Sequence, residues 1–287
     1  MPITELETPN AQYLKTGHLA GDPVLWRVTS VDPTRSWRQV FSLLALLVDR
    51  ELTATYKRSV LGTAWALITP LLQLFVISFT FHSVLGTHIE GYASFTFLGL
   101  MVWNWFQSSL IDATGCVVKN HRLVNQPGLQ REILPAVSIS TQLIHFVMCL
   151  PLLLILMNYA DGISVGPTIV WLPLLIVLQF LFTLGLSYPL AALNVRFRDT
   201  KHILGIVLNL GLFLTPVFYS AATFPQHWLF LECNPLTGLL ASYRGVILYG
   251  QAPNFSSLAL ITALTFAGLP LGALMYKIRS MRFLEDL

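Results

Sequence analysis

The sequence has 287 residues, of which 54% are hydrophobic and only 11% are charged. Ordinary soluble domains have about 25% charged residues, so this composition excludes a soluble globular protein and indicates a chain whose apolar surface faces a bilayer. The formal net charge of +3 is too small to indicate a nucleic-acid-binding protein. The three cysteines are isolated and form no pattern typical of a metal site.

The chain begins with a polar segment, 1–35, which we expect to be a cytoplasmic extension. No cleaved leader is expected, because acidic and polar residues stand where a signal peptide has basic and then apolar ones. Ser36 and Gln39 then have the spacing of a helix capping box, and apolar residues recur at helical spacing on one face. The pattern predicts an amphipathic helix over 36–58 that lies in the headgroup layer. Packing of the same apolar face against the rest of the protein is the alternative.

Six stretches of at least 21 residues contain no Asp, Glu, Lys or Arg. About 20 helical residues cross a hydrocarbon core about 30 Å thick. Prolines inside these stretches do not exclude helices, because neighbouring helices can satisfy a kinked backbone. We therefore expect a six-span domain over 59–287, with spans near 65–86, 95–117, 133–158, 168–194, 202–220 and 256–277.

The basic residues indicate the orientation of the chain. Sixteen of the seventeen precede the first expected span, follow the last, or lie in the loops near 118–132 and 195–201. The exception is Arg244, in the stretch 221–255. Because cytoplasmic loops carry an excess of Lys and Arg, both termini are expected in the cytoplasm.

The stretch 221–255 is too apolar for a simple loop and too interrupted for a seventh span. It has two short apolar runs around Cys233, Asn234 and Pro235. Runs of this length are typical of re-entrant or interfacial segments. The pattern therefore predicts a re-entrant helical hairpin at the outer surface, between spans five and six.

The sequence carries no motif for nucleotide binding, hydrolysis or zinc proteolysis. Within the expected spans Asp112 is the single acid, near the cytoplasmic end of the second span. Acids at such depth often mark ion relays, but this lone one is expected to be a hydrogen-bonded structural group, and His82 and His145 are expected to be packed neutral residues. A transporter with neither an ion-coupling site nor an ATPase must take its energy from a partner.

Four groups of residues mark the start of the first span, the two cytoplasmic loops and the outer hairpin. They are Tyr56, Lys57, Arg58, Ser59, Leu61, Gly62, Trp65 and Pro70; Asn120, Leu123 and Val124 with Arg131 to Pro135; Asn194 to Asp199 with Pro216 and Val217; and Asn234 to Gly238 with Tyr243 and Arg244. Together and in this order they resemble the ABC-2 type permeases that export O-antigen, capsule and teichoic acid. One departure is visible, because the aromatic-proline pair usual before the Arg-Glu pair is replaced by Leu129 and Gln130.

The resemblance implies an all-α integral membrane protein with the ABC-2, or type V exporter, fold. It implies a permease subunit and not an enzyme: two copies of the chain form the pathway, and two copies of a separate cytoplasmic ATPase bind ATP and Mg and drive transport. The implied cargo is a polysaccharide such as O-antigen or capsule on a lipid of the undecaprenyl pyrophosphate type. It would move from the cytoplasmic to the outer side of a bacterial inner membrane, and no cofactor or metal is expected in this chain.

Two other functions remain compatible with the sequence. One is an ABC-2 permease for another lipid, a teichoic acid or a drug. The other is a membrane enzyme acting on lipid-linked sugars. Such an enzyme would need a cluster of carboxylates or histidines at the membrane surface, whereas the acids expected on the outer side, Glu90, Asp161 and Glu232, are scattered.

Basic residues around the start of the first span are candidates for binding the lipid pyrophosphate. They are Lys57, Arg58, Arg38 and Arg50. A pyrophosphate at headgroup depth would accept charge-assisted hydrogen bonds, which are about twice as strong as neutral ones. The alternative is that these residues orient the chain and pair with ordinary anionic lipids.

Two further sets of residues complete the candidate site. Aromatic rings that could stack on sugar faces, or simply pack or face lipid, are Trp65, Phe75, Phe79, Trp103 and Phe106. The loops 119–132 and 196–202 are the only cytoplasmic connections between the expected spans, so force from the ATPase would enter largely there. The residues expected to couple to the ATPase are Asn120, Gln126, Arg131, Glu132, Arg196, Arg198 and Asp199.

Overall fold

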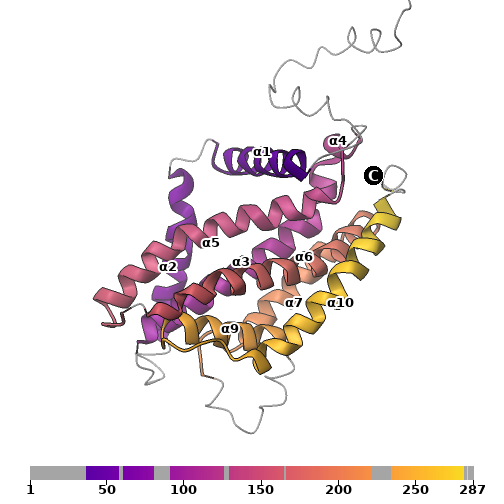
Figure 1. Ribbon diagram of the computed structural model, residues 1–287. Helices are drawn as coiled ribbons and strands as arrows, with labels where there is room; N and C mark the ends of the chain where they lie inside the picture. Colours follow the sequence, from indigo (N-terminus) through magenta and orange to yellow (C-terminus); the bar gives the residue numbers. More distant parts are fainter. Residues whose placement is uncertain are drawn as a thin grey trace, which may run out of the picture.

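The computed structural model describes residues 37–57, 61–80, 91–125, 129–164, 166–220, 234–280 and 283. Within these ranges the regular structure is helical, with no strand, so the predicted all-α class is confirmed (Figure 1). The α-helices are α1 (Trp37–Tyr56), α2 (Trp65–Ser78), α3 (Tyr92–Lys119), α4 (His121–Val124), α5 (Ile133–Tyr159), α6 (Leu172–Arg196), α7 (Thr200–Leu214), α9 (Pro235–Ile247) and α10 (Phe255–Ser280). Two short 3₁₀ helices, Gly62–Ala64 and Pro167–Trp171, precede α2 and α6.

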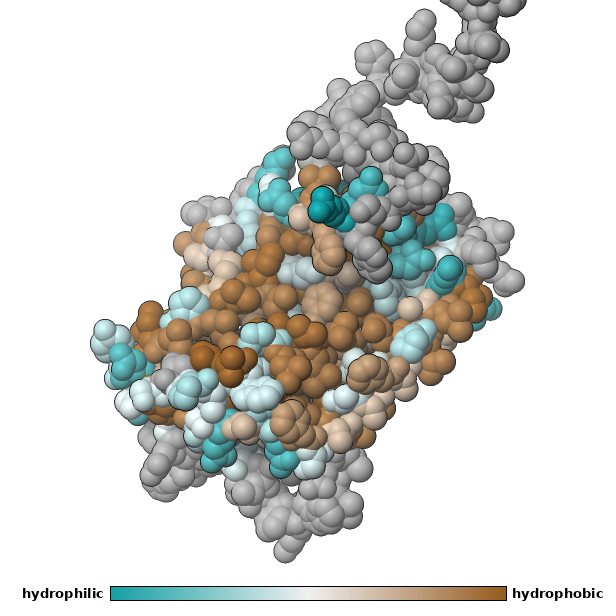
Figure 2. Space-filling model, in the orientation of Figure 1, coloured by the Kyte–Doolittle hydropathy of each residue, from teal (hydrophilic) through white to brown (hydrophobic). Residues whose placement is uncertain are grey.

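Three segments are long and apolar enough to cross a bilayer by length and composition: Ile133–Tyr159, Pro167–Arg196 and Phe255–Ser280. The helices α2 and α7 are shorter apolar helices. A band of hydrophobic residues crosses the middle of the face seen in Figure 2, and hydrophilic residues gather toward its two ends. This distribution suits a chain whose middle lies in hydrocarbon. The number of crossings remains a prediction.

A helix occurs within each of the six expected span ranges, but α7 is shorter than expected. It ends at Leu214, whereas the expected range extended to 220. Thr215, the residue before Pro216, has ψ 139° and is therefore extended. A proline disfavours helical backbone at the preceding residue, which explains why the helix stops here.

The helix α3 is the centre of the bundle. Twenty of its 28 residues are buried, and it packs against α2, α5, α6 and α7. The helices α6 and α10 pack closely through glycine, since a Cβ added at Gly272 would lie 2.5 Å from the Gly185 carbonyl oxygen. Small residues permit such approach where helices associate in lipid without a hydrophobic driving force.

The N-terminal helix α1 lies across one end of the bundle, over α5 (Figure 1). Leu43, Leu47 and Val48 are buried from α1, in a cluster with Ile133 and Val137 of α5. The structure thus shows packing of the apolar face against the protein, while the headgroup position remains a prediction. Segment 1–35 and the first arm of the expected outer hairpin, 221–233, lie outside the described residues.

Candidate functional site

A groove of about 490 Å³ lies between α1, α2, α3, α5 and α7. It is lined at the level of the middle of α3 by aromatic, hydroxyl and carboxamide side chains. None of the 18 described residues that line it is Asp, Glu, Lys or Arg. An uncharged but strongly polar groove is unusual among apolar helices, because polar groups at this depth are costly unless they find partners.

Five carboxamides are the main polar groups of the groove. They are Gln73, Asn104, Gln107, Gln142 and Asn209. The Asn104 amide donates to Gln73 across α3 and α2, and the Gln107 amide donates to Asn209 across α3 and α7, each at 2.8 Å. The indole of Trp103 donates to Gln107 at 2.7 Å. These bonds hold the walls together yet leave hydrogen-bonding capacity unused, because each carboxamide has two donor hydrogens and two acceptor positions.

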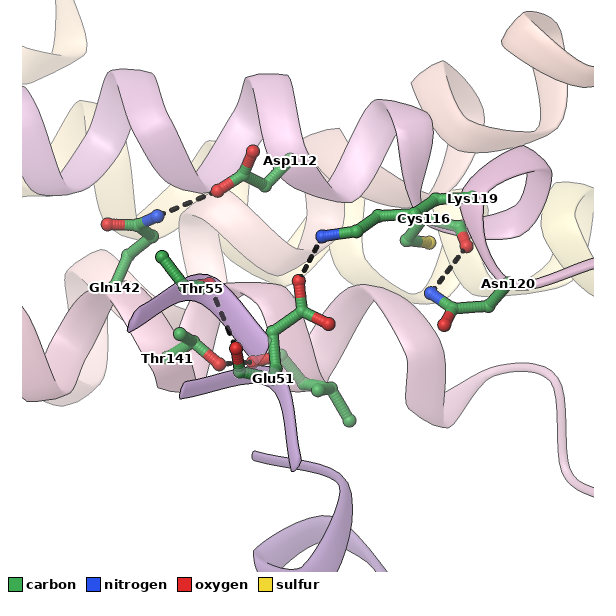
Figure 3. A network of polar contacts seen from close by, with 9 residues as sticks. Glu51, Thr55, Asp112, Cys116, Lys119, Asn120, Thr141 and Gln142 are labelled. Atoms are coloured by element: carbon green, nitrogen blue, oxygen red, sulfur yellow. Dashed lines mark hydrogen bonds and ion pairs between the residues drawn. The ribbon is translucent and has the colours of Figure 1, made fainter. Parts of the chain in front are cut away.

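A chain of hydrogen bonds connects α1 to α5 and α3 along the groove wall. The Gln142 amide donates to Asp112 at 2.7 Å (Figure 3). A carboxylate only accepts hydrogen bonds, so the nitrogen of the Gln142 amide faces Asp112 and its oxygen faces His145 Nδ1, at 3.0 Å. Because an amide oxygen also only accepts, His145 Nδ1 must carry the proton. The Tyr56 hydroxyl then donates to His145 Nε2 at 2.8 Å. Burial raises the pKa of Tyr56, so the hydroxyl keeps its proton.

Asp112 and His145, both expected from the sequence to be structural groups, belong to this chain of hydrogen bonds. Asp112 is hydrogen-bonded, as expected for a lone acid, but its side chain is exposed. His145 is not simply packed, since it lines the groove with a hydrogen bond at each ring nitrogen. His82 lies outside the described residues.

The candidate aromatic residues occupy three different environments. Trp65 is 47% exposed and lines the groove. Phe75 and Phe79 are exposed on or just after α2 without lining it. Trp103 and Phe106 are buried in the core between α3, α6 and α7, where Phe106 stacks on Phe182. In a single copy of the chain, only Trp65 of the five faces the groove.

The candidate pyrophosphate residues are spread along α1. Lys57 is exposed and directly follows groove-lining Tyr56. Arg50 is half-buried, two helical turns earlier, and Arg38 is exposed at the other end of α1. At 1.5 Å per residue, Arg38 is about 28 Å from Lys57, too far for both to bind one pyrophosphate. Arg58 lies outside the described residues.

Polar contacts anchor the residues of the first expected coupling loop. Lys119 forms an ion pair with Glu51 of α1, and Asn120 donates to the Cys116 carbonyl at 2.9 Å (Figure 3). Arg131 donates to the Ser280 carbonyl at the end of α10. The Tyr188 hydroxyl donates to the Glu132 carbonyl at 3.3 Å. Arg131 and Glu132 therefore join this loop to α10 and α6, whereas the Asn120 amide caps the end of its own helix, α3. Gln126 lies outside the described residues.

The turn between α6 and α7 is more open. Arg196, Arg198 and Asp199 are all exposed. A Cβ added at Gly115, near the end of α3, would lie 3.2 Å from Lys201 Nζ, so this turn is at the same end of the bundle as α4. These three residues are available to a partner.

Sequence reasoning missed the carboxamides that line the groove and the role of Arg244. The carboxamides carried a signal, since all five lie inside otherwise charge-free stretches. Arg244 is buried in α9 and donates to the carbonyls of Pro216 and Val217 at 2.7 and 2.8 Å. A third bond goes to the Phe95 carbonyl at 3.4 Å. All three partners are distant from Arg244 in sequence, so no local pattern predicted them.

Comparisons with known proteins bear on what such a groove does. The model of the family described as ABC-2 type transporter matches residues 42–248. The chain is 33% identical over 260 residues to the O-antigen export system permease protein RfbA of Myxococcus xanthus. The matched region covers 88% of this chain and 98% of the relative. Two proteins of the same name from Klebsiella pneumoniae are 28% and 26% identical, over 74% and 86% of this chain and 82% and 96% of their own lengths.

Proposed function

Because the chain belongs to the ABC-2 type transporter family, we propose that it is the transmembrane subunit of an ABC exporter for a lipid-linked O-antigen polysaccharide. The cargo would move from the cytoplasmic to the outer side of the bacterial inner membrane. Support comes from relatives named as O-antigen export permeases that match this chain over nearly their whole length. The observation that carries the proposal is the groove, whose lining suits sugars.

The chemistry of the groove matches that of a polysaccharide. Sugar hydroxyls both donate and accept hydrogen bonds, as do the side-chain amides of Gln73, Asn104 and Asn209. The exposed ring of Trp65 offers a flat apolar surface for the C–H face of a sugar. A set of weak, similar contacts would let a polymer slide without tight binding.

The energy for transport would come from a separate ATPase subunit that binds ATP and Mg. The exposed turn with Arg196, Arg198 and Asp199 is the surface we assign to that contact, because it is charged and lies at the same end as α4. Two copies of this chain would enclose the polymer, since the groove of a single copy is open to one side.

The lipid pyrophosphate would bind where α1 meets the groove. Lys57 stands next to Tyr56 in sequence, so a headgroup bound there would deliver the attached sugar to the groove. Arg58 follows directly, and Arg50 lies on the same face of α1 two turns earlier. Arg38 is excluded from this cluster by its distance.

A complementation experiment tests the proposal. A bacterial strain lacking its O-antigen exporter is supplied with this chain, its ATPase and the enzymes that build the polymer, and surface polymer is measured by lipopolysaccharide gel and by antibody on intact cells. We expect surface O-antigen only with both subunits. Replacing the groove carboxamide with Gln107→Leu should lower export several-fold, whereas Gln251→Leu, at an exposed position outside the groove, should not. A normally assembled complex that displays no polymer would contradict the proposal.

A further inference from the structure

We propose that the groove selects polysaccharides whose repeat units are uncharged and rejects those that carry a negative charge in each repeat. This inference rests on the proposed function and specifies its substrate class. It distinguishes a neutral glycan from acidic capsule-like polymers and from polyol phosphates, which the family resemblance leaves equally open.

The described groove wall carries no positively charged side chain. None of its 18 residues is Lys or Arg, and His145 uses both ring nitrogens in hydrogen bonds to Tyr56 and Gln142. An anion that leaves water must find a cation or several donors, or its desolvation is not compensated. The carboxamides can offer donors but no charge.

Asp112 places a carboxylate next to the groove wall. Its carboxylate accepts from Gln142, which itself lines the groove, and its side chain is exposed. A fixed negative charge next to the wall repels anionic repeats and leaves neutral ones unaffected. The nearby Lys119 does not offset this charge freely, because it is paired with Glu51.

One basic residue of the described part of the chain stands next to a groove-lining residue in sequence. Lys57 is exposed and directly follows Tyr56, the last residue of α1, which lines the groove. A cation there would bind the lipid pyrophosphate of the proposed cargo, whatever the repeat unit of the polymer. It therefore attracts the lipid carrier without discriminating between neutral and acidic polymers, and the discrimination is left to the uncharged wall beyond it.

A matched pair of substrates tests the inference. One lipid-linked glycan with a neutral hexose repeat is used as it is, and a second portion is oxidised so that its primary hydroxyls become carboxylates. The two share backbone, length and lipid pyrophosphate and differ only in charge. Stimulation of ATP hydrolysis by each is measured in nanodiscs that contain the chain with its ATPase. The neutral polymer should stimulate at a concentration about tenfold or more below that of the oxidised one, because an unpaired anion loses its hydration in the groove.

Variants place a cation in the groove. Gln73→Lys, and Thr69→Lys one turn earlier on α2, should each bring the half-stimulating concentration of the oxidised polymer closer to that of the neutral one. Gln251→Lys adds the same charge at an exposed position outside the groove and should leave the ratio unchanged. Two groove positions are used so that a failure of one variant to assemble does not decide the result.

Two outcomes overturn the inference. If wild-type protein responds equally to both polymers, export of glycans stands but selection against charge is wrong. If neither polymer stimulates a complex that hydrolyses ATP at its basal rate, the proposed function is wrong and the inference falls with it.

Discussion

The guanidinium carbon of Arg244 lies 3.4 Å from the centroid of the Phe95 ring. The two residues come from α9 and the start of α3, and the same guanidinium donates to the Pro216 and Val217 carbonyls that follow α7. One buried side chain thus joins three segments on the side expected to face outward. It is also the single basic residue that the charge distribution places on that side.

Removing this side chain should destabilise the protein. Arg244→Ala leaves two buried carbonyls without donors, each worth about 1–3 kcal/mol, and loses a cation–π contact worth up to about 2 kcal/mol. We expect a lower thermal unfolding temperature in detergent, with Arg244→Lys recovering only part of it, since an ammonium has no planar face to stack on Phe95. Arg198→Ala, at an exposed position, should leave the temperature unchanged; equal stability of Arg244→Ala and wild type would contradict the assignment.

Because α6 packs closely on α10, substitutions at two glycines of α10 should have different effects on stability. Gly272→Ala would place a Cβ 2.5 Å from the Gly185 carbonyl oxygen, and such overpacking costs about 1–3 kcal/mol. At Gly268 an added Cβ meets nothing within 4 Å. Gly268→Ala should therefore be neutral or slightly stabilising, because alanine favours the helix. Thermal unfolding of both variants checks this, and an identical response would mean that the approach of the two helices is looser than the structure shows.

The distance along α1 separates two roles for its basic residues. Neutralising Lys57 and Arg58 together to Gln should lower export and substrate-stimulated ATP hydrolysis, while insertion and assembly with the ATPase stay normal. Arg38→Gln, about 28 Å away along α1, should have little effect on either measurement. If the double variant assembles and exports at the wild-type rate, Lys57 and Arg58 serve only to orient the chain.

The exposed turn between α6 and α7 predicts where the ATPase binds. A photocrosslinker at Arg198 or Asp199 should link to the ATPase in the purified complex, because both side chains are exposed at the end of the bundle that carries α4. A crosslinker at Ala160, exposed just after α5, serves as the control and should give no product. Crosslinks from Ala160 alone would reverse the assigned ends.

The orientation of the chain can be measured in intact cells. With Cys233 replaced by Ser, the remaining cysteines, Cys116 and Cys149, are buried and should react slowly. A cysteine introduced at Gln251 should then react with an impermeant reagent from outside, and one at His202 only after permeabilisation, since basic loops are cytoplasmic. The opposite pattern would invert the predicted topology.

Much of the helical arrangement was predictable because its signals are local. A long charge-free stretch indicates by itself a segment that lies in hydrocarbon, so the ranges of α5, α6 and α10 follow from composition. The apolar face of α1 follows from helical spacing. The length of α7 was overestimated even though Pro216 was visible, because in membranes a proline can kink a helix as well as end it. The family resemblance rested on short ordered groups of residues and is confirmed by the match over 42–248.

The sequence by itself determined that the chain is an all-helical membrane protein of this family, since composition and short motifs are properties of neighbouring residues. Only the tertiary structure decided which polar side chains share a groove. Asn104 meets Gln73 across 31 residues, Gln107 meets Asn209 across 102, and Arg244 meets Phe95 across 149. The same distinction separated Trp65, which lines the groove, from Trp103, which is buried. Helical spacing places a residue on a face, but the packing of other helices determines what that face contacts.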